Sequence, residues 1–135
     1  LESIRCVISA GAPVSPRVIE RFQSMLRNDA AIHTPYGATE SLPVATISSR
    51  EILSATRHQT DRGAGTCVGI PVPSIEAAAI KISDDPIDRW DEKLKVPTGE
   101  VGEIVVKGPQ VTREYYNAPM HTALAKITAR SSFAG

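Results

Sequence analysis

The first part of the chain combines a short apolar run with one clear helical pattern. Residues 4–8 are mostly β-branched and almost all apolar, which predicts a buried strand. Small residues at 9–13 then break the run, and Ser15 with Pro16 has the form of a helix N-cap followed by a first helical residue. After them, apolar residues recur at helical spacing until about Asn28: Val18, Ile19, Phe22, Met25 and Leu26. The pattern predicts a strand followed by an amphipathic helix.

Two more strands and a second helix are expected before residue 62. The stretches 30–33 and 44–47 are apolar and short, as strands are. Ser48 and Glu51 stand three residues apart, which is the spacing of a capping box, and predict a helix that opens there and runs to about Thr56. We therefore expect an α/β part at residues 1–62.

The pattern changes after the glycines at 63 and 65. Residues 75–82 and 103–106 read as strands separated by turns rich in proline and glycine. Between them, residues 84–95 form a charged stretch that holds the only tryptophan, Trp90, which we expect to lie on the surface of a solvated loop. The pattern predicts a β-rich part at 63–117, and residues 118–135 form a tail for which it predicts no structure.

Composition limits the possible partners. Lys and Arg number 15, as do Asp and Glu, so the formal net charge is zero across 135 residues. A balanced charge and 4% aromatic residues argue against a nucleic-acid or anionic-membrane partner. No apolar stretch approaches the ~20 residues of a membrane span. Cys6 and Cys67 lack metal-like spacing and fall in apolar surroundings, so we expect buried free thiols rather than a disulfide, and a cytoplasmic location.

The segment 34–41 carries the strongest chemical signal. A strand is expected to run into Tyr36, Gly37 allows a tight bend, and Thr39 and Glu40 follow at once. The aromatic face, hydroxyl and carboxylate form the set that a nucleotide needs: a ring for stacking, a donor for phosphate and an anion for Mg²⁺. The alternative is a plain turn in which Tyr36 packs and Glu40 is solvated. Taken alone, the residues favour the plain turn, because short patterns arise by chance.

Two other segments are weaker in isolation. Residues 9–13 are small and stand between a strand and a helix, where a flat ligand can approach the backbone of an α/β fold. No Gly-Lys-Ser/Thr follows them, so they are not a P-loop, and a plain turn is favoured. Residues 98–109 contain Gly99 and Gly102 around a turn that enters a strand, and on their own they predict a hairpin.

Taken together and in order, these segments resemble the acyl- and aryl-adenylate-forming superfamily, which contains acyl-CoA synthetases, peptide-synthetase adenylation domains and luciferases. The resemblance rests on residues 9–13, 36–40, 65–73 and 99–109 and covers about residues 1–120. It implies a fold in which the chain is part of the large N-terminal domain, with an α/β part followed by a β-rich, barrel-like part. It also reverses the preference for plain turns given above.

The resemblance implies a reaction in two steps. A carboxylate attacks the α-phosphorus of Mg·ATP to give an acyl-adenylate and pyrophosphate, and a nucleophile then displaces AMP. Carried over by motif, Tyr36 would stack on adenine, Thr39 would contact phosphate and Glu40 would hold Mg²⁺. These last two are the implied catalytic residues.

The remaining site residues come from the same resemblance. Gly11, Ala12 and Pro13 would border the adenine and acyl pocket, and Gly37 would permit the bend. His33 would lie near the carboxylate or acyl pocket, although a structural histidine at a strand end is an equal alternative. His58 and His121 match nothing in the family's pattern and are interpreted as surface residues.

The amino-acid sequence of residues 33–45 and 112–117 is similar to that of the bacterial olefin-pathway branch of the superfamily. Those proteins act as β-lactone synthetases on long-chain β-hydroxy fatty acids. The resemblance implies that the substrate's own hydroxyl displaces AMP, so coenzyme A is a possible but not a required cofactor. The implied partner is a small carboxylic acid.

Several family features are not found in this sequence. The lysine-containing phosphate loop, the ribose-binding aspartate expected after Tyr116-Asn117, and the C-terminal domain with its catalytic lysine have no counterpart. The chain also opens without Met on a strand-like segment. We therefore expect an internal piece of an enzyme, inactive by itself and missing the rest of its N-terminal domain and its C-terminal domain.

Other interpretations stay open at this level. The chain could be a non-catalytic remnant that binds a nucleotide or a partner, or its parent could be an ordinary acyl-CoA synthetase. The sequence does not decide the length of the acid, the accepting nucleophile, the oligomeric state or the origin of the last ten residues.

Overall fold

The computed structural model describes residues 1–128 and divides the chain into two compact units. The first unit spans Leu1–Ile75 and the second begins at Glu76.

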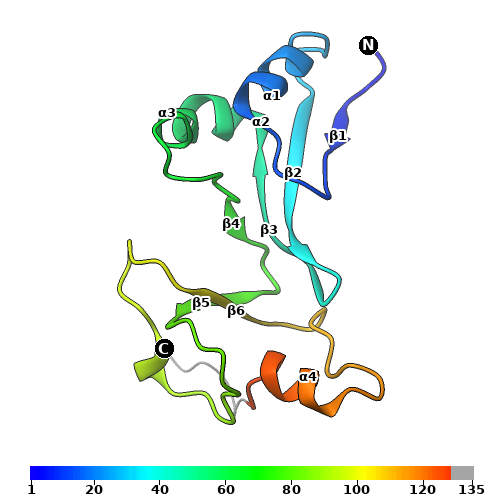
Figure 1. Cartoon of the computed structure of the whole chain (residues 1–135). Helices are drawn as coiled ribbons and strands as arrows, with labels where there is room; N and C mark the ends of the chain where they lie inside the picture. Colours follow the sequence, from blue (N-terminus) through cyan, green and yellow to red (C-terminus); the bar gives the residue numbers. More distant parts are fainter. Residues whose placement is uncertain (129–135) are drawn as a thin grey trace. The chain divides into compact units, whose positions relative to one another are not determined.

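The first unit is built on a four-stranded sheet (Figure 1). Its strands lie in the order β1 (Cys6–Ile8), β2 (Ala31–Ala38), β3 (Ser41–Ser48) and β4 (Ile70–Pro71). The pair β1–β2 is parallel and is connected through helix α1 (Pro16–Gln23), whereas the other two pairs are antiparallel. The expected order of strand, helix and strand is therefore present.

One face of this sheet packs against helices. After β3 the chain continues into α2 (Ser49–Glu51), the π-helix η1 (Ile52–Thr56) and α3 (Arg57–Asp61). The core combines apolar side chains from α1, from the turn after it, from the strands and from η1, namely Ile19, Leu26, Ala30, Ile32, Ile47 and Ile52. The capping box is confirmed, because Ser48 and Glu51 exchange the two expected hydrogen bonds.

Two element lengths differ from the prediction. Strands β2 and β3 each have 8 residues, longer than the apolar runs suggested, because cross-strand pairing continues from His33–Ser48 down to Ala38–Ser41. Helix α1 ends at Gln23 rather than near Asn28. The following turn is tighter, with Met25 N donating to the Phe22 carbonyl (3.0 Å) and Leu26 N donating to the Gln23 carbonyl (3.0 Å).

The prediction of a buried strand at residues 4–8 is wrong. Only Cys6–Ile8 forms a strand, and Ile8 is 71% exposed while Cys6 is exposed as well. Val7 packs on the core from the same strand. Successive side chains of a strand point to opposite faces, and only the face of Val7 carries the helical core. Cys67 is half-buried, and both cysteines are free thiols.

The second unit contains a two-stranded antiparallel sheet of β5 (Glu76–Ile80) and β6 (Glu103–Lys107). A 3₁₀ turn η2 (Glu92–Leu94) follows the charged stretch, and helix α4 (Pro119–Ala125) lies in the segment for which the sequence predicted no structure. Residues 129–135, the rest of that tail, lie outside the described residues.

Trp90 lies half-buried at the surface of the charged stretch, in agreement with the prediction. Its indole Nε1 donates to Glu92 Oε1 (2.8 Å). The Lys95 ammonium lies 5.7 Å from the ring centroid and also pairs with Glu92 (2.6 Å). Because a hydrogen bond, an ion pair and a cation–π contact account for these groups, we assign this cluster a local structural role.

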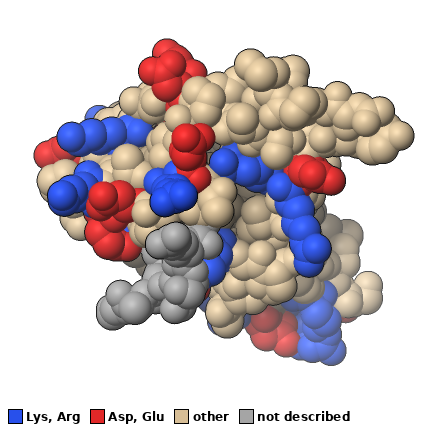
Figure 2. Space-filling model, turned by 90° about the horizontal axis from the view of Figure 1, so that it is seen from below, with Lys and Arg blue, Asp and Glu red and all other residues tan. Residues whose placement is uncertain are grey.

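Figure 2 shows Lys and Arg side chains interspersed with Asp and Glu over the face in view. This distribution accords with the formal net charge of zero. Across residues 1–128, no helix has the length and apolar character needed to cross a membrane.

Candidate functional site

The β2–β3 hairpin ends in a two-residue loop formed by Thr39 and Glu40. Ala38 pairs with Ser41 on either side of the loop, and the register is irregular between Tyr36 and Ala38. A Cβ at Gly37 would meet the Ser41 carbonyl oxygen and would approach Leu42 Cδ1 to 2.9 Å. Only glycine fits this close approach of the two strands. The chain therefore reverses direction at Thr39 and Glu40, and not at Gly37, where the sequence predicted the bend.

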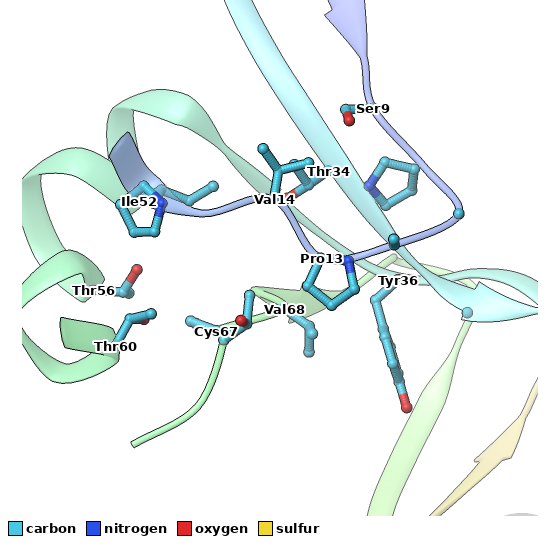
Figure 3. A pocket seen from close by; sticks show the side chains of 16 residues that line it. Ser9, Pro13, Val14, Thr34, Tyr36, Ile52, Thr56, Thr60, Cys67 and Val68 are labelled. Atoms are coloured by element: carbon cyan, nitrogen blue, oxygen red, sulfur yellow. The ribbon is translucent and has the colours of Figure 1, made fainter. Parts of the chain in front are cut away.

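A cavity of about 250 Å³ lies beside this hairpin (Figure 3). Four segments of the first unit contribute its walls: the loop after β1, strand β2, the helical segment η1–α3, and the residues that lead to β4. Gly11 in the first of these segments has φ +98°, a conformation that L side chains rarely adopt. The cavity therefore sits past the carboxyl end of the parallel strand β1, where ligands bind in α/β sheets.

Five of the predicted site residues come together in this cavity: Gly11, Ala12, Pro13, Tyr36 and Gly37 all line it. In Figure 3, the Tyr36 and Pro13 side chains lie on the same side of the hollow. Tyr36 is 37% exposed, so part of its ring is open to a ligand. Two segments that stand more than twenty residues apart in the sequence thus form one wall.

Three other predicted residues are not part of the cavity lining. Thr39 is exposed and Glu40 half-buried, and both lie at the tip of the hairpin. His33 stands opposite Ser48 in the sheet. Since Thr34 lines the cavity, strand alternation directs the His33 side chain to the other face. The pKa of the Glu51 carboxyl is lowered first by its hydrogen bonds with Ser48 and, to a smaller extent, by the nearby His33.

The structure adds cavity residues that sequence reasoning missed. They are Ser9, Val14, Pro16, Thr34, Pro35, Ile52, Thr56, Thr60, Thr66, Cys67 and Val68. The spacing of Ile52, Thr56 and Thr60 by four residues was a usable signal for one helical face. Cys67 and Val68 belong to the segment 65–73, whose motif was noted but given no role.

A buried hydrogen-bond network positions strand β2 next to the helices. The Ser49 hydroxyl is fully buried, donates to Gln23 Oε1 (2.6 Å) and accepts from Ile32 N (3.1 Å). Gln23 Nε2 in turn donates to the Ala30 carbonyl (3.0 Å). The network joins α1, β2 and α2 through satisfied polar groups, which fixes the direction of the strand that carries Tyr36.

Gly69 positions the part of the cavity wall that contains Cys67 and Val68. It has φ +87°, and a Cβ at this position would collide with the Thr46 carbonyl oxygen of β3. The absence of a side chain lets the backbone before β4 lie directly on β3. This contact brings the neighbouring Cys67 and Val68 to the cavity.

No Lys, Arg, His, Asp or Glu lines the cavity. Among its lining residues only Tyr36 and Cys67 carry titratable groups. Charged pairs lie outside it: Arg57 binds Glu20 (2.7 Å) and joins α3 to α1, and this hydrogen bond lowers the pKa of Glu20. The part of the chain that the structure describes contains no cluster of three or more His, Cys, Asp or Glu that could hold a metal ion. The arrangement suits a neutral planar group next to a hairpin tip that offers a hydroxyl and a carboxylate.

Comparison with known proteins bears directly on this geometry. The family model described as AMP-binding enzyme matches residues 1–116, which include the whole cavity and the hairpin. The chain belongs to the AMP-binding enzyme family. The superfamily resemblance drawn from the motifs is therefore confirmed.

Curated relatives in this family are up to 50% identical to the chain over the aligned residues. An olefin β-lactone synthetase of Stenotrophomonas maltophilia is 50% identical over 94% of the chain, and one of Xanthomonas campestris is 48% identical over 98%. These matches confirm the resemblance to the olefin-pathway branch. A long-chain-fatty-acid–CoA ligase of Salmonella typhimurium is 33% identical over 87% of the chain. The chain spans about a quarter of the length of the two synthetases (23% and 24%) and 17% of the ligase.

Solved structures of adenylate-forming enzymes share the fold. O-succinylbenzoate coenzyme A synthetase from Bacillus subtilis matches with a TM-score of 0.62 at 24% identity, covering 89% of this chain and 22% of that one. The N-terminal subdomain of Klebsiella oxytoca NpsA matches with a TM-score of 0.57 at 25% identity, covering 87% of this chain and 26% of that one. The expected fold class, an α/β piece of the large N-terminal domain, is confirmed.

Proposed function

We propose that the chain is the nucleotide-binding part of an AMP-forming acid ligase. In the proposed reaction a carboxylate oxygen bonds to the α-phosphorus of ATP. The bond between the α-phosphorus and the oxygen that bridges it to the β-phosphate breaks, and pyrophosphate leaves. The observation that carries the proposal is the cavity without charged lining residues in which Gly11–Pro13 meet Tyr36 and Gly37. Membership of the AMP-binding family supports the same ligand.

The residues take their roles from this geometry. Adenine stacks on the exposed part of the Tyr36 ring, with the 11–13 loop on the same side of the cavity. The ribose and phosphates then extend out of the cavity toward the hairpin tip. There Thr39 would donate to a phosphate oxygen, and Glu40 would supply a carboxylate oxygen to Mg²⁺, which prefers such ligands. His33 would contact the acid substrate only from the face of the sheet opposite the cavity.

The cavity volume supports a ring rather than a whole substrate. Sites for complete drug-sized ligands measure about 300–1,000 Å³, whereas this cavity measures about 250 Å³. A nucleobase with part of its ribose fits this space, and a long acyl chain does not. We infer that the acyl chain is bound by parts of the enzyme outside this cavity.

The proposed acid is a long-chain β-hydroxy fatty acid. The two olefin β-lactone synthetases at 50% and 48% identity support this choice. In the second step the β-hydroxyl oxygen would bond to the acyl carbon, its proton would leave, and AMP would depart with the former carboxylate oxygen. No coenzyme A takes part. The ordinary acyl-CoA synthetase reaction is the second candidate, supported by the 33% identical fatty-acid ligase.

The experiment uses the full-length enzyme that carries this chain, in a reducing buffer that keeps its free thiols reduced. With Mg·ATP and a long-chain β-hydroxy acid, we expect AMP and a β-lactone without added coenzyme A. Strict dependence on coenzyme A, with an acyl-CoA product, would select the second candidate. Failure to release AMP with any long-chain acid would refute both.

A further inference from the structure

The wall of the cavity opposite Tyr36 comes from an irregular helical segment. The π-helix Ile52–Thr56 runs directly into α3, and Ile52, Thr56 and Thr60 from these two elements all line the cavity (Figure 3). π-turns inside helices are rare and occur frequently at functional sites. Thr66, from the segment before β4, lines the same cavity. We call Thr56, Thr60 and Thr66 the threonine band.

The hydroxyls of the threonine band make no hydrogen bond to any group within residues 1–128. Helical Ser and Thr hydroxyls commonly bond back to the carbonyl four residues earlier. The neighbouring Ser54 follows this rule, since its hydroxyl donates to the Arg50 carbonyl (2.7 Å). Thr122 in α4 does so as well, with the Ala118 carbonyl at 3.0 Å. The band's hydroxyls therefore remain open to a ligand in the cavity.

The direction of the hairpin decides which part of a nucleotide meets the band. The β2–β3 hairpin extends away from helices α1–α3 (Figure 1). Thr39 and Glu40 form its tip, and Tyr36 precedes that tip in β2. A nucleotide with its phosphates at the tip and its base on Tyr36 therefore turns the outer edge of the base toward the helices. The cavity has no charged lining residue, so the group it receives is neutral but can form hydrogen bonds.

We propose that the threonine band contacts the polar edge of the nucleobase, including its exocyclic amino group, and thereby contributes to the choice of base. This inference rests on the proposed function and assigns it a further set of specificity-determining residues. A hydroxyl both donates and accepts, so one can accept from the amino group while another donates to a ring nitrogen. A site that hydrogen-bonds a group disfavours an analogue that lacks it, since its polar atoms are then left unpaired.

The test combines two ligands with a set of threonine variants of the full-length enzyme, all measured in the presence of Mg²⁺. Equilibrium dissociation constants are measured for ATP and for purine riboside 5′-triphosphate, which lacks the exocyclic amino group. For the wild type we expect the analogue to bind about three- to tenfold more weakly, the range of one neutral hydrogen bond. In Thr56→Val, Thr60→Val or Thr66→Val this difference should fall toward one, and in the matching Thr→Ser variant it should return.

Ser54→Ala is the matched control. It removes a hydroxyl from the same helical segment, but one that is already bonded to the backbone and does not line the cavity. The difference between ATP and the analogue should stay at its wild-type value in this variant. Thermal melting of each variant separates loss of contact from loss of folding.

The outcomes distinguish this inference from the proposed function. If the wild type binds neither triphosphate, the proposed function fails. If the wild type binds ATP but all three valine variants keep the full difference between ATP and the analogue, the threonine band does not contact the amino group. A wild type that binds both triphosphates equally also overturns the inference and leaves the proposed function intact.

Discussion

Tyr36 combines a position at the cavity wall with partial exposure of its ring, which is what a side chain needs to stack on a base. We expect Tyr36→Ala to weaken ATP binding by roughly 1–3 kcal/mol, the scale seen when a base loses its aromatic platform. Tyr36→Phe is the matched control and should keep most of the affinity, because it retains the ring. Titration calorimetry with the full-length enzyme measures both. Equal affinity in wild type and Tyr36→Ala would remove Tyr36 from the base site.

Glu40 lies at the hairpin tip, apart from the cavity lining, which is where the phosphates and their metal are expected. Replacing Glu40 by Gln keeps the size of the side chain and removes its charge. We expect the variant to need more Mg²⁺ for half-maximal pyrophosphate release and to react more slowly, while ATP affinity measured without Mg²⁺ changes little. An unchanged dependence of the rate on Mg²⁺ would contradict a metal role for this carboxylate.

At the scale of elements, the capping box before α2 makes stability depend on pH. The pKa of Glu51 lies below its ordinary value of 4.5, first because the Ser48 hydroxyl bonds to the carboxylate and then because the Ser48 backbone N–H does so. A lowered folded-state pKa means that ionised Glu51 favours the fold. This contribution is present above the unfolded-state pKa and is lost as pH falls through the folded-state pKa.

The comparison of wild type with Glu51→Gln isolates this effect from the other acidic groups. We expect the difference in free energy of unfolding between them to be constant near neutral pH and to shrink as the pH drops below about 4.5. Urea denaturation at a series of pH values measures it. A difference that stays constant from neutral pH down to about pH 3 would show that the hydrogen bonds of Glu51 do not depend on its charge.

Local patterns were predictable from sequence, whereas features set by packing between distant segments were not. The capping box and the start of α1 depend on residues within one turn of each other, and both were found. The length of β2 depends on the close approach at Gly37, and the exposure of Cys6 depends on which face the helices cover. Neither the length of β2 nor the exposure of Cys6 can be predicted from a short stretch of sequence.

The same distinction applies to the site. Gly11–Pro13 and Tyr36-Gly37 were predicted because their motifs are contiguous, and the structure brings them into one cavity. Thr56 and Thr60 were missed because their helical spacing gives a shared face but not the segments that this face meets, and Thr66 comes from the separate segment before β4. Glu40 and Thr39 keep their proposed roles at the tip, which only a bound nucleotide tests.

At the scale of the whole molecule, the proposed base site lies in a cavity that offers no cation to the phosphates. Its lining contains no Lys or Arg, and the chain spans about a quarter of its relatives' length. Adenylation gathers negative charge on the phosphates, and losing even one stabilising donor costs ~10²–10³ in rate. We expect the isolated 135-residue chain to show no acid-dependent ATP–pyrophosphate exchange where the full-length enzyme does. Robust exchange by the isolated chain would contradict this expectation.

The central claim, activation of an acid as its adenylate, is tested most directly by following the carboxylate oxygen. The full-length enzyme is given Mg·ATP and a long-chain β-hydroxy acid labelled with ¹⁸O in its carboxyl group, and the products are analysed by mass spectrometry. If the carboxylate attacks the α-phosphorus and AMP later departs from the acyl carbon, the released AMP carries one ¹⁸O and the pyrophosphate carries none. Unlabelled AMP, or label in pyrophosphate or inorganic phosphate, would contradict the account.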